Sequence, residues 1–99
     1  MISKDVICEA IERQAIVSFY YGGGQRIVEP YLLGINELGR LILVGYQVGG
    51  YSESGEFPPW RSFELRSVRN LEAIDKSVRP RKGIVSRDFG IRERICWRE

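Results

Sequence analysis

The chain has 99 residues, of which 43% are hydrophobic, and this is enough for one small domain with a modest core. Its fifteen basic and thirteen acidic residues leave a net charge of +2, too near neutral to indicate nucleic-acid binding on its own. The chain has no histidine, which excludes imidazole bases, Ser-His or Cys-His nucleophile pairs and the commonest nitrogen ligand for metals. Because the acidic residues are also scattered, we expect no enzymatic activity, no cofactor and no metal site.

A short amphipathic helix is predicted at the N-terminus, where Ser3 can cap the first turn. Its apolar stripe consists of Val6, Ile7, Ala10 and Ile11 and extends to Gln14. The pattern then changes to that of a strand over residues 15–21. One face of this strand carries Val17, Phe19 and Tyr21. The glycines at 22–24 precede another strand, so they are interpreted as a hairpin turn and not as a phosphate-binding loop.

The stretch from Arg26 to Tyr46 holds most of the apolar residues that can build a core, as two strands joined by a turn at 36–39. Pro30 cannot donate a ladder hydrogen bond, so it predicts an edge or a bulge in the first of these strands. Residues 41–44 are apolar without alternation, which is typical of a strand covered on both faces. We expect the N-terminal helix or a second copy of the protein to cover its outer side.

The next segment, residues 49–59, is rich in Gly, Ser, Glu and Pro and predicts an exposed loop. The fourth strand follows at 60–65, and in it Arg61 shares a face with Phe63 and Leu65. Burying an unpaired arginine is too costly, so Arg61 is expected at the rim of the sheet, facing a carboxylate, a phosphate or water. The remaining elements of this part are a tight turn at 66–69 and a short fifth strand at 70–75.

The C-terminal segment begins with a basic linker at 79–83 and continues with a period of two. One parity carries Phe89, Ile91, Ile95 and Trp97, and the other carries Arg92, Arg94 and Arg98. This pattern predicts a strand with one apolar and one basic face, in which Gly90 marks a bulge. An apolar face has to be buried, so we expect this strand to pair with a sheet edge, either in its own chain or across a twofold dimer.

The charge is distributed unevenly between two parts of the chain. Residues 1–60 carry four basic and seven acidic side chains, a net charge of −3, while residues 61–99 carry eleven and six, a net charge of +5. The second part is therefore a candidate anion-binding surface, with a solvated charged face as the alternative.

The two cysteines, Cys8 and Cys96, lie near opposite ends of the chain and have no metal-ligand spacing, so we expect reduced thiols. The N-terminus has acidic residues where a secretion signal needs an apolar run, and no apolar stretch approaches the roughly 20 residues of a membrane span. We expect a cytoplasmic protein that does not associate with membranes.

The order and spacing of residues over 15–75 resemble the WYL domain of bacterial regulatory proteins. The similarity is carried by Val17-x-Phe19-x-Tyr21, Arg26-x-Val28-x-Pro30, the strand from Arg40 to Tyr46, and Arg61-x-Phe63-x-Leu65-x-x-Val68. The triplet that names the family falls on Leu41, Ile42 and Leu43, so only its last residue is kept. An arginine often found in the turn after the fourth strand falls on Ser67, and Arg66 is the neighbouring charge.

The resemblance implies a small five-stranded Sm-like, SH3-like β-barrel over residues 1–78, with the N-terminal helix, followed by the linker and additional strand at 79–99. It also implies a ligand sensor for a nucleotide or single-stranded nucleic acid, acting in transcription regulation. The implied ligand-binding residues are Tyr21, Arg26, Arg61 and Arg66, and further aromatic candidates are Tyr20, Tyr46 and Trp60. Guanidinium groups bind phosphate in a bidentate manner and an aromatic ring stacks on a base, so the chemistry is coherent.

The chain has no recognisable helix-turn-helix, since that motif needs two helices across a short turn. A WYL-type module of this kind would act alone, on a partner regulatory protein, or as a homodimer. The alternative is a non-catalytic protein-interaction or oligomerisation module without a nucleic-acid ligand, in which the arginines pair with acids such as Glu29 and Glu64.

Overall fold

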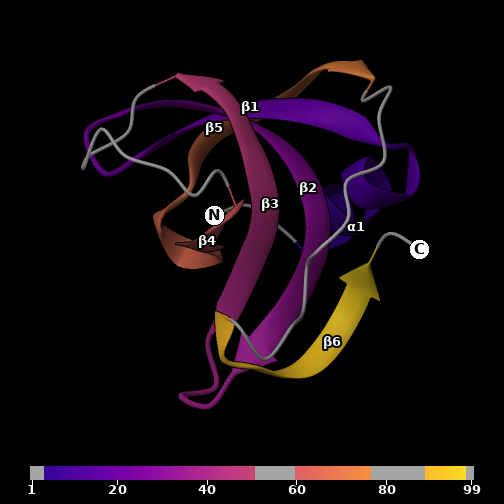
Figure 1. Cartoon of the computed structure of the whole chain (residues 1–99), viewed down its shortest axis with the longest axis vertical. Coiled ribbons are helices and arrows are strands. Elements are labelled where there is room, and N and C mark those ends of the chain that lie inside the picture. The colour runs from indigo at the N-terminus through magenta and orange to yellow at the C-terminus, as the bar shows by residue number, and fades with distance from the viewer. Residues whose placement is uncertain (1–3, 51–59, 77–88, 98–99) are drawn as a thin grey trace.

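The computed structural model describes residues 4–50, 60–76 and 89–97, and the protein is mainly β, as predicted (Figure 1). The basic linker at 79–83 and most of the loop predicted at 49–59 lie outside the described residues. The elements are α1 (Lys4–Glu12), β1 (Ala15–Tyr21), β2 (Gly24–Asn36), β3 (Leu41–Gly50), β4 (Trp60–Glu64), the 3-10 helix η1 (Leu65–Ser67), β5 (Arg69–Lys76) and β6 (Ile91–Trp97). Within these ranges no helix is long and apolar enough to cross a membrane.

The six strands form one antiparallel sheet in the order β4-β3-β2-β1-β5, and β6 pairs with β2 beside this path. The first and last strands of that order, β4 and β5, make no strand pairing with each other within the described ranges, so the sheet is open where a closed barrel was expected. The reason is local, because β4 contributes only five residues, all paired with β3, before η1 turns the chain towards β1.

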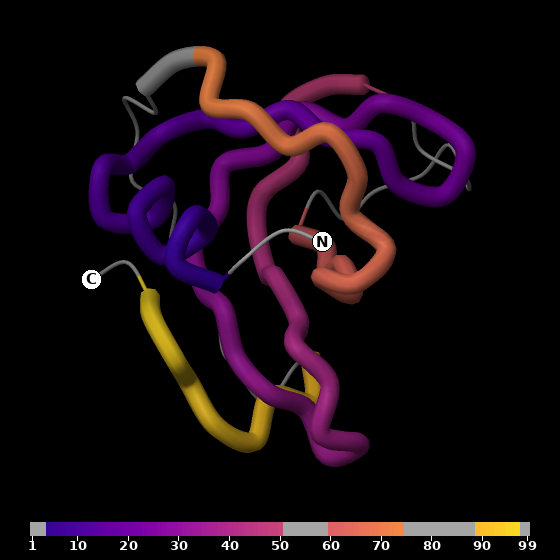
Figure 2. Tube along the Cα trace, turned by 180° about the vertical axis from the view of Figure 1, so that it is seen from behind, coloured from indigo at the N-terminus to yellow at the C-terminus, as the bar shows by residue number. Residues whose placement is uncertain are grey.

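The long strand β2 is the centre of the sheet. It pairs with β3 along most of its length, with β1 near its start and with β6 near its end (Figure 2). The register of β2 and β3 shifts between Pro30 and Leu32, which confirms the bulge predicted from the proline. The predicted C-terminal strand is also confirmed, and it pairs with β2 of its own chain, from Leu32 opposite Trp97 to Asn36 opposite Ile91. The prediction that its apolar residues share one buried face was wrong, because Trp97 is 44% exposed and Ile91 and Ile95 pack on different apolar clusters. Gly90 has a φ of +69° in the turn before β6, outside the strand in which a bulge was expected.

The apolar side chains form two clusters on opposite faces of β3. The main core joins α1 to the sheet and consists of Ile7, Ala10, Ile11, Ala15, Val17, Phe19, Val28, Leu33, Leu43, Phe63, Leu65 and Val68. A second cluster of Leu32, Ile42 and Val44 packs against Phe89 and Ile91. The prediction that β3 is covered on both faces is therefore correct. The predicted helix α1 covers one face, and Phe89 and Ile91 cover the other. Cover by a second copy stays a prediction.

A disulfide joins Cys8 of α1 to Cys96 of β6, so the expectation of reduced thiols was wrong. The two residues are 88 positions apart in sequence, but β6 returns to the side of α1 and brings their Cα atoms to 5.7 Å (Figure 2). Structural disulfides persist mainly in oxidising compartments. The cytoplasmic location stays a prediction, and this disulfide counts against it.

Candidate functional site

Two of the predicted ligand-binding residues, Tyr21 and Arg26, lie together at the hairpin between β1 and β2. The carbonyl oxygen of Tyr21 accepts a hydrogen bond of 3.1 Å from Arg26 Nε. The Arg26 guanidinium carbon also lies 5.7 Å from the centroid of the Tyr21 ring and 5.8 Å from that of Phe63, within cation–π range. Arg26 is only 3% exposed. Its contacts hold the Tyr21 ring in place and leave the guanidinium little access to solvent.

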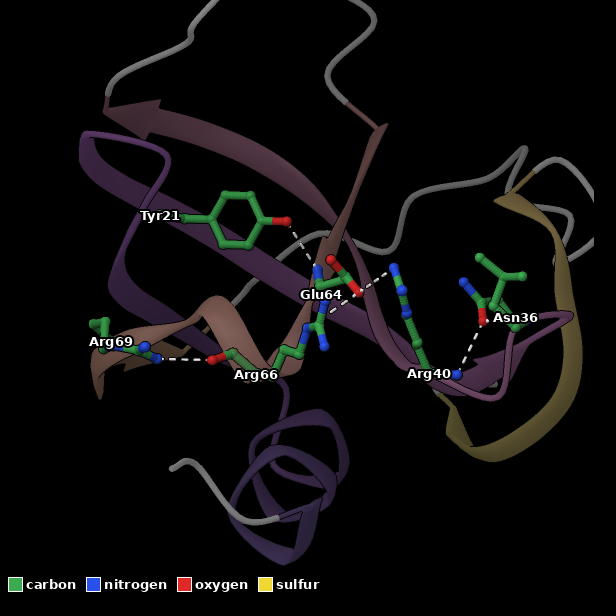
Figure 3. A network of polar contacts seen from close by, with 7 residues as sticks. Tyr21, Asn36, Arg40, Glu64, Arg66 and Arg69 are labelled. Carbon is green, nitrogen blue, oxygen red and sulfur yellow. Dashed lines mark hydrogen bonds and ion pairs between the residues drawn. The ribbon is translucent and has the colours of Figure 1, made fainter.

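The Tyr21 ring reaches across from β1 to the end of β4. It packs edge-on against Phe63 with centroids 5.1 Å apart, and its hydroxyl accepts a hydrogen bond of 3.0 Å from the backbone N–H of Glu64 (Figure 3). A buried backbone donor needs a partner, so this bond stabilises the start of η1 as well as the ring. The hydroxyl thus connects the predicted aromatic residue to a carboxylate that lies beside two arginines.

Two arginines that are distant in sequence, Arg40 before β3 and Arg66 in η1, approach a single oxygen of Glu64. Arg40 Nη1 lies 3.3 Å and Arg66 Nε lies 3.5 Å from Glu64 Oε1 (Figure 3). The arginine side chains are 46% and 64% exposed, and the Glu64 side chain is 26% exposed. A third exposed arginine, Arg69, donates from Nη1 to the carbonyl oxygen of Arg66 at 2.8 Å. We call Arg40, Arg66, Arg69 and Glu64 the arginine cluster; its three cations and one anion give it a net charge of +2.

The turn at residues 36–39 fixes the position of the Arg40 backbone. The Asn36 carboxamide oxygen accepts hydrogen bonds of 3.0 Å from the backbone N–H groups of Leu38 and Arg40, and Gly39 has a φ of +77°. Asparagine and glycine are the residues that such a turn requires. The turn therefore delivers Arg40 to the start of β3, on the side where β4 ends.

Arg61, the fourth predicted residue, lies on β4 opposite Gly45 of β3. Its side chain is partly buried, and alternation along the strand puts it on the same face of β4 as Phe63. The structure thus brings Tyr21 and Arg26 into contact and connects Arg66 to Tyr21 through Glu64. It places Arg61 near the start of β4, at the opposite end of that strand from Glu64.

The sequence did not predict Arg40 or Arg69 as residues of the site, and of these two Arg40 is the one that contacts Glu64. Arg40 is 24 positions from Glu64, and the turn that carries it was interpreted only as a turn. The available signal was the strand register, because Ile42 pairs with Glu64 and Arg40 is two residues before Ile42. A correct alignment of β3 with β4 would have placed the arginine beside the carboxylate.

The additional aromatic candidates form a separate group. Trp60 packs edge-on against Tyr31 and Tyr46, with centroid distances of 4.9 and 5.3 Å. The Tyr31 hydroxyl donates to Glu29 Oε1 at 3.3 Å, and both of these residues are buried. Tyr20, in contrast, is half exposed on β1. Trp60 of β4 thus packs with Tyr31 of β2 and Tyr46 of β3 as an aromatic group on the sheet.

The site offers three arginine cations, one carboxylate and an aromatic ring. In the part of the chain that is described, no three Cys, Asp or Glu side chains come close enough together to hold a metal ion. No protein-family model, curated protein sequence or solved structure matches this chain. The net positive charge and exposed guanidinium groups of the arginine cluster favour the binding of an anion.

Proposed function

We propose that the chain is a non-catalytic, WYL-type ligand-sensing module that binds a nucleotide or single-stranded nucleic acid in a regulatory role. The observation that carries the proposal is the convergence of the exposed Arg40 and Arg66 on one carboxylate oxygen, next to the Glu64 amide that Tyr21 holds. Exposed guanidinium groups in excess over carboxylates are the feature that attracts phosphate.

The fold that we propose is the small Sm-like or SH3-like barrel implied by the family resemblance. Two observations support this proposal. The strands β4 and β5, at the two ends of the strand order, are separated in sequence only by η1 and one further residue. In addition, the Tyr21 hydroxyl of β1 is hydrogen-bonded to the backbone at the end of β4. Both features draw the ends of the sheet towards each other, as closure requires.

The proposed roles follow from exposure. The exposed Arg40 and Arg66 and the partly buried Arg61 contact the phosphates of the ligand, and Tyr21 provides the aromatic surface beside them. Arg26 is buried and supports Tyr21, so its contribution is to the shape of the site. Stacking of a base on an aromatic ring supplies about 1–3 kcal/mol, and the phosphate contacts make binding strongly dependent on salt.

The test is fluorescence anisotropy with labelled single-stranded DNA and RNA at low and high salt. The variant Arg61→Ala/Arg66→Ala should weaken binding about 10-fold or more, since each lost phosphate contact removes a counterion-releasing charge. The matched control is Lys4→Ala/Arg13→Ala, which removes two exposed positive charges from α1. Equal weakening by both variants, or no binding by the wild type, contradicts the proposal.

A second candidate, a protein-interaction or oligomerisation module, is favoured by a different observation. Trp97 is 44% exposed near the end of β6, and the Arg94 guanidinium carbon lies 4.6 Å from its ring centroid. Exposed tryptophan and arginine are the residues that most often dominate protein interfaces. Sedimentation equilibrium tests for a homodimer: an association that Trp97→Ala abolishes supports this candidate, and a monomer at all concentrations contradicts the homodimer.

A further inference from the structure

The two ion pairs in the arginine cluster are longer than the ion pair on α1 between Arg13 and Glu9. Glu64 Oε1 is 3.3 Å from Arg40 and 3.5 Å from Arg66, whereas Arg13 and Glu9 of α1 approach to 2.8 Å. Charge-assisted hydrogen bonds between nitrogen and oxygen are strongest at a separation of about 2.7–2.9 Å. The two distances to Glu64 are about 0.5 Å longer than this optimum. One carboxylate oxygen therefore serves two guanidinium groups without satisfying either fully.

The backbone on both sides of this carboxylate is held by hydrogen bonds of its own. Arg40 follows a turn closed by the Asn36 side chain, and its own N–H also bonds to that side chain. On the other side, the carbonyl oxygen of Arg66 is held by Arg69, and η1 is closed by the 3.1 Å bond from Val68 N to Leu65 O. The starting points of the two arginine side chains are fixed before a ligand arrives, which lowers the entropic cost of binding.

We propose that Arg40 and Arg66 form a phosphate subsite, and that the Glu64 carboxylate occupies this subsite until the phosphate displaces it. A terminal phosphate offers three oxygen acceptors and nearly two negative charges, so it suits two guanidinium forks better than one carboxylate oxygen does. The inference rests on the proposed function, because it assigns the phosphate of that ligand to a definite pair of side chains. It also adds a regulator, since Glu64 sets the affinity of the subsite by competing for the same donors.

The experiment uses pyrophosphate as the probe and follows the arginine Nε–Hε signals by NMR. In the wild type, the signals of Arg40 and Arg66 should shift together as pyrophosphate is added. The variant Glu64→Gln removes the competing charge at nearly constant size, and we expect it to bind pyrophosphate about 2- to 10-fold more tightly, the range for losing one or two exposed ion pairs. The matched control Glu9→Gln, which breaks the α1 ion pair, should leave pyrophosphate affinity unchanged.

Two results overturn the subsite: Glu64→Gln binding pyrophosphate no more tightly than the wild type, or shifts that spare Arg40 and Arg66. Because Glu64→Gln is expected to increase affinity, a damaged fold cannot imitate the predicted result. Parallel titrations with AMP and with a single-stranded oligonucleotide distinguish a free nucleotide from a strand as the source of the phosphate. Oligonucleotide binding that Arg61→Ala/Arg66→Ala weakens but Arg40→Ala does not weaken overturns the subsite alone. Pyrophosphate binding without AMP or oligonucleotide binding overturns the proposed function alone.

Discussion

Removing the disulfide between Cys8 and Cys96 should lower the stability of this domain substantially. The bond spans 88 positions, and the chain-entropy relation for a loop of this length gives about 4.6 kcal/mol at 25 °C as the stabilisation lost. A domain of this size is usually stable by only about 5–15 kcal/mol, so the expected loss is a large part of the total. None of the seven residues of β6 is fully buried, so only its pairing with β2 and the partial packing of Ile91 and Ile95 would hold this strand once the bond is gone.

The assay is guanidinium unfolding of the wild type and of Cys8→Ala/Cys96→Ala, together with hydrogen exchange of the amides in β6 and at the end of β2. We expect a lower unfolding midpoint and faster exchange at Leu32–Asn36, where β6 pairs. Wild-type protein treated with a reductant is the control and should behave like the double variant. A loss of less than about 1 kcal/mol with unchanged exchange would refute the reasoning that the bond constrains this strand.

Three substitutions test local parts of the structure, each by the free energy of unfolding in denaturant. Gly34→Val should lower the free energy of unfolding by about 1–3 kcal/mol and loosen β6, because a Cβ at Gly34 would lie 2.5 Å from Ile91 Cγ2. Amide hydrogen exchange in β6 at the wild-type rate would contradict this. Tyr21→Phe should cost about 1 kcal/mol because the Glu64 amide loses its acceptor, and an unchanged midpoint would show that the bond contributes nothing. Asn36→Ala removes the acceptor of two turn amides and should also cost about 1 kcal/mol, whereas Glu37→Ala, on the exposed side of the same turn, should cost less than half of that.

Strands were predictable here because side-chain alternation is a local signal. Val17, Phe19 and Tyr21 mark β1, and the alternation of Ile91 to Trp97 marks β6 although that strand is far from its partner in sequence. The turn at 36–39 was predictable for the same reason, since asparagine and glycine at fixed spacing define it.

Contacts between distant segments were not predictable from such local patterns. Period and composition say nothing about Cys8 meeting Cys96, because that contact depends on where β6 docks. The arginine cluster depends on the register of β3 and β4, which places Arg40 beside Glu64. Closure of the sheet is a further long-range property, since it depends on the accumulated twist and length of five strands.

The most direct test of the anion-binding account is the salt dependence of single-stranded DNA binding. Each phosphate contact contributes about 0.7 to the slope of log affinity against log salt for single strands, so Arg40→Ala/Arg66→Ala should reduce the slope by about 1.4. Lys4→Ala/Arg13→Ala removes the same charge from α1 and should leave the slope unchanged. A slope that is the same in the wild type and in Arg40→Ala/Arg66→Ala would contradict the claim that these arginines bind phosphate.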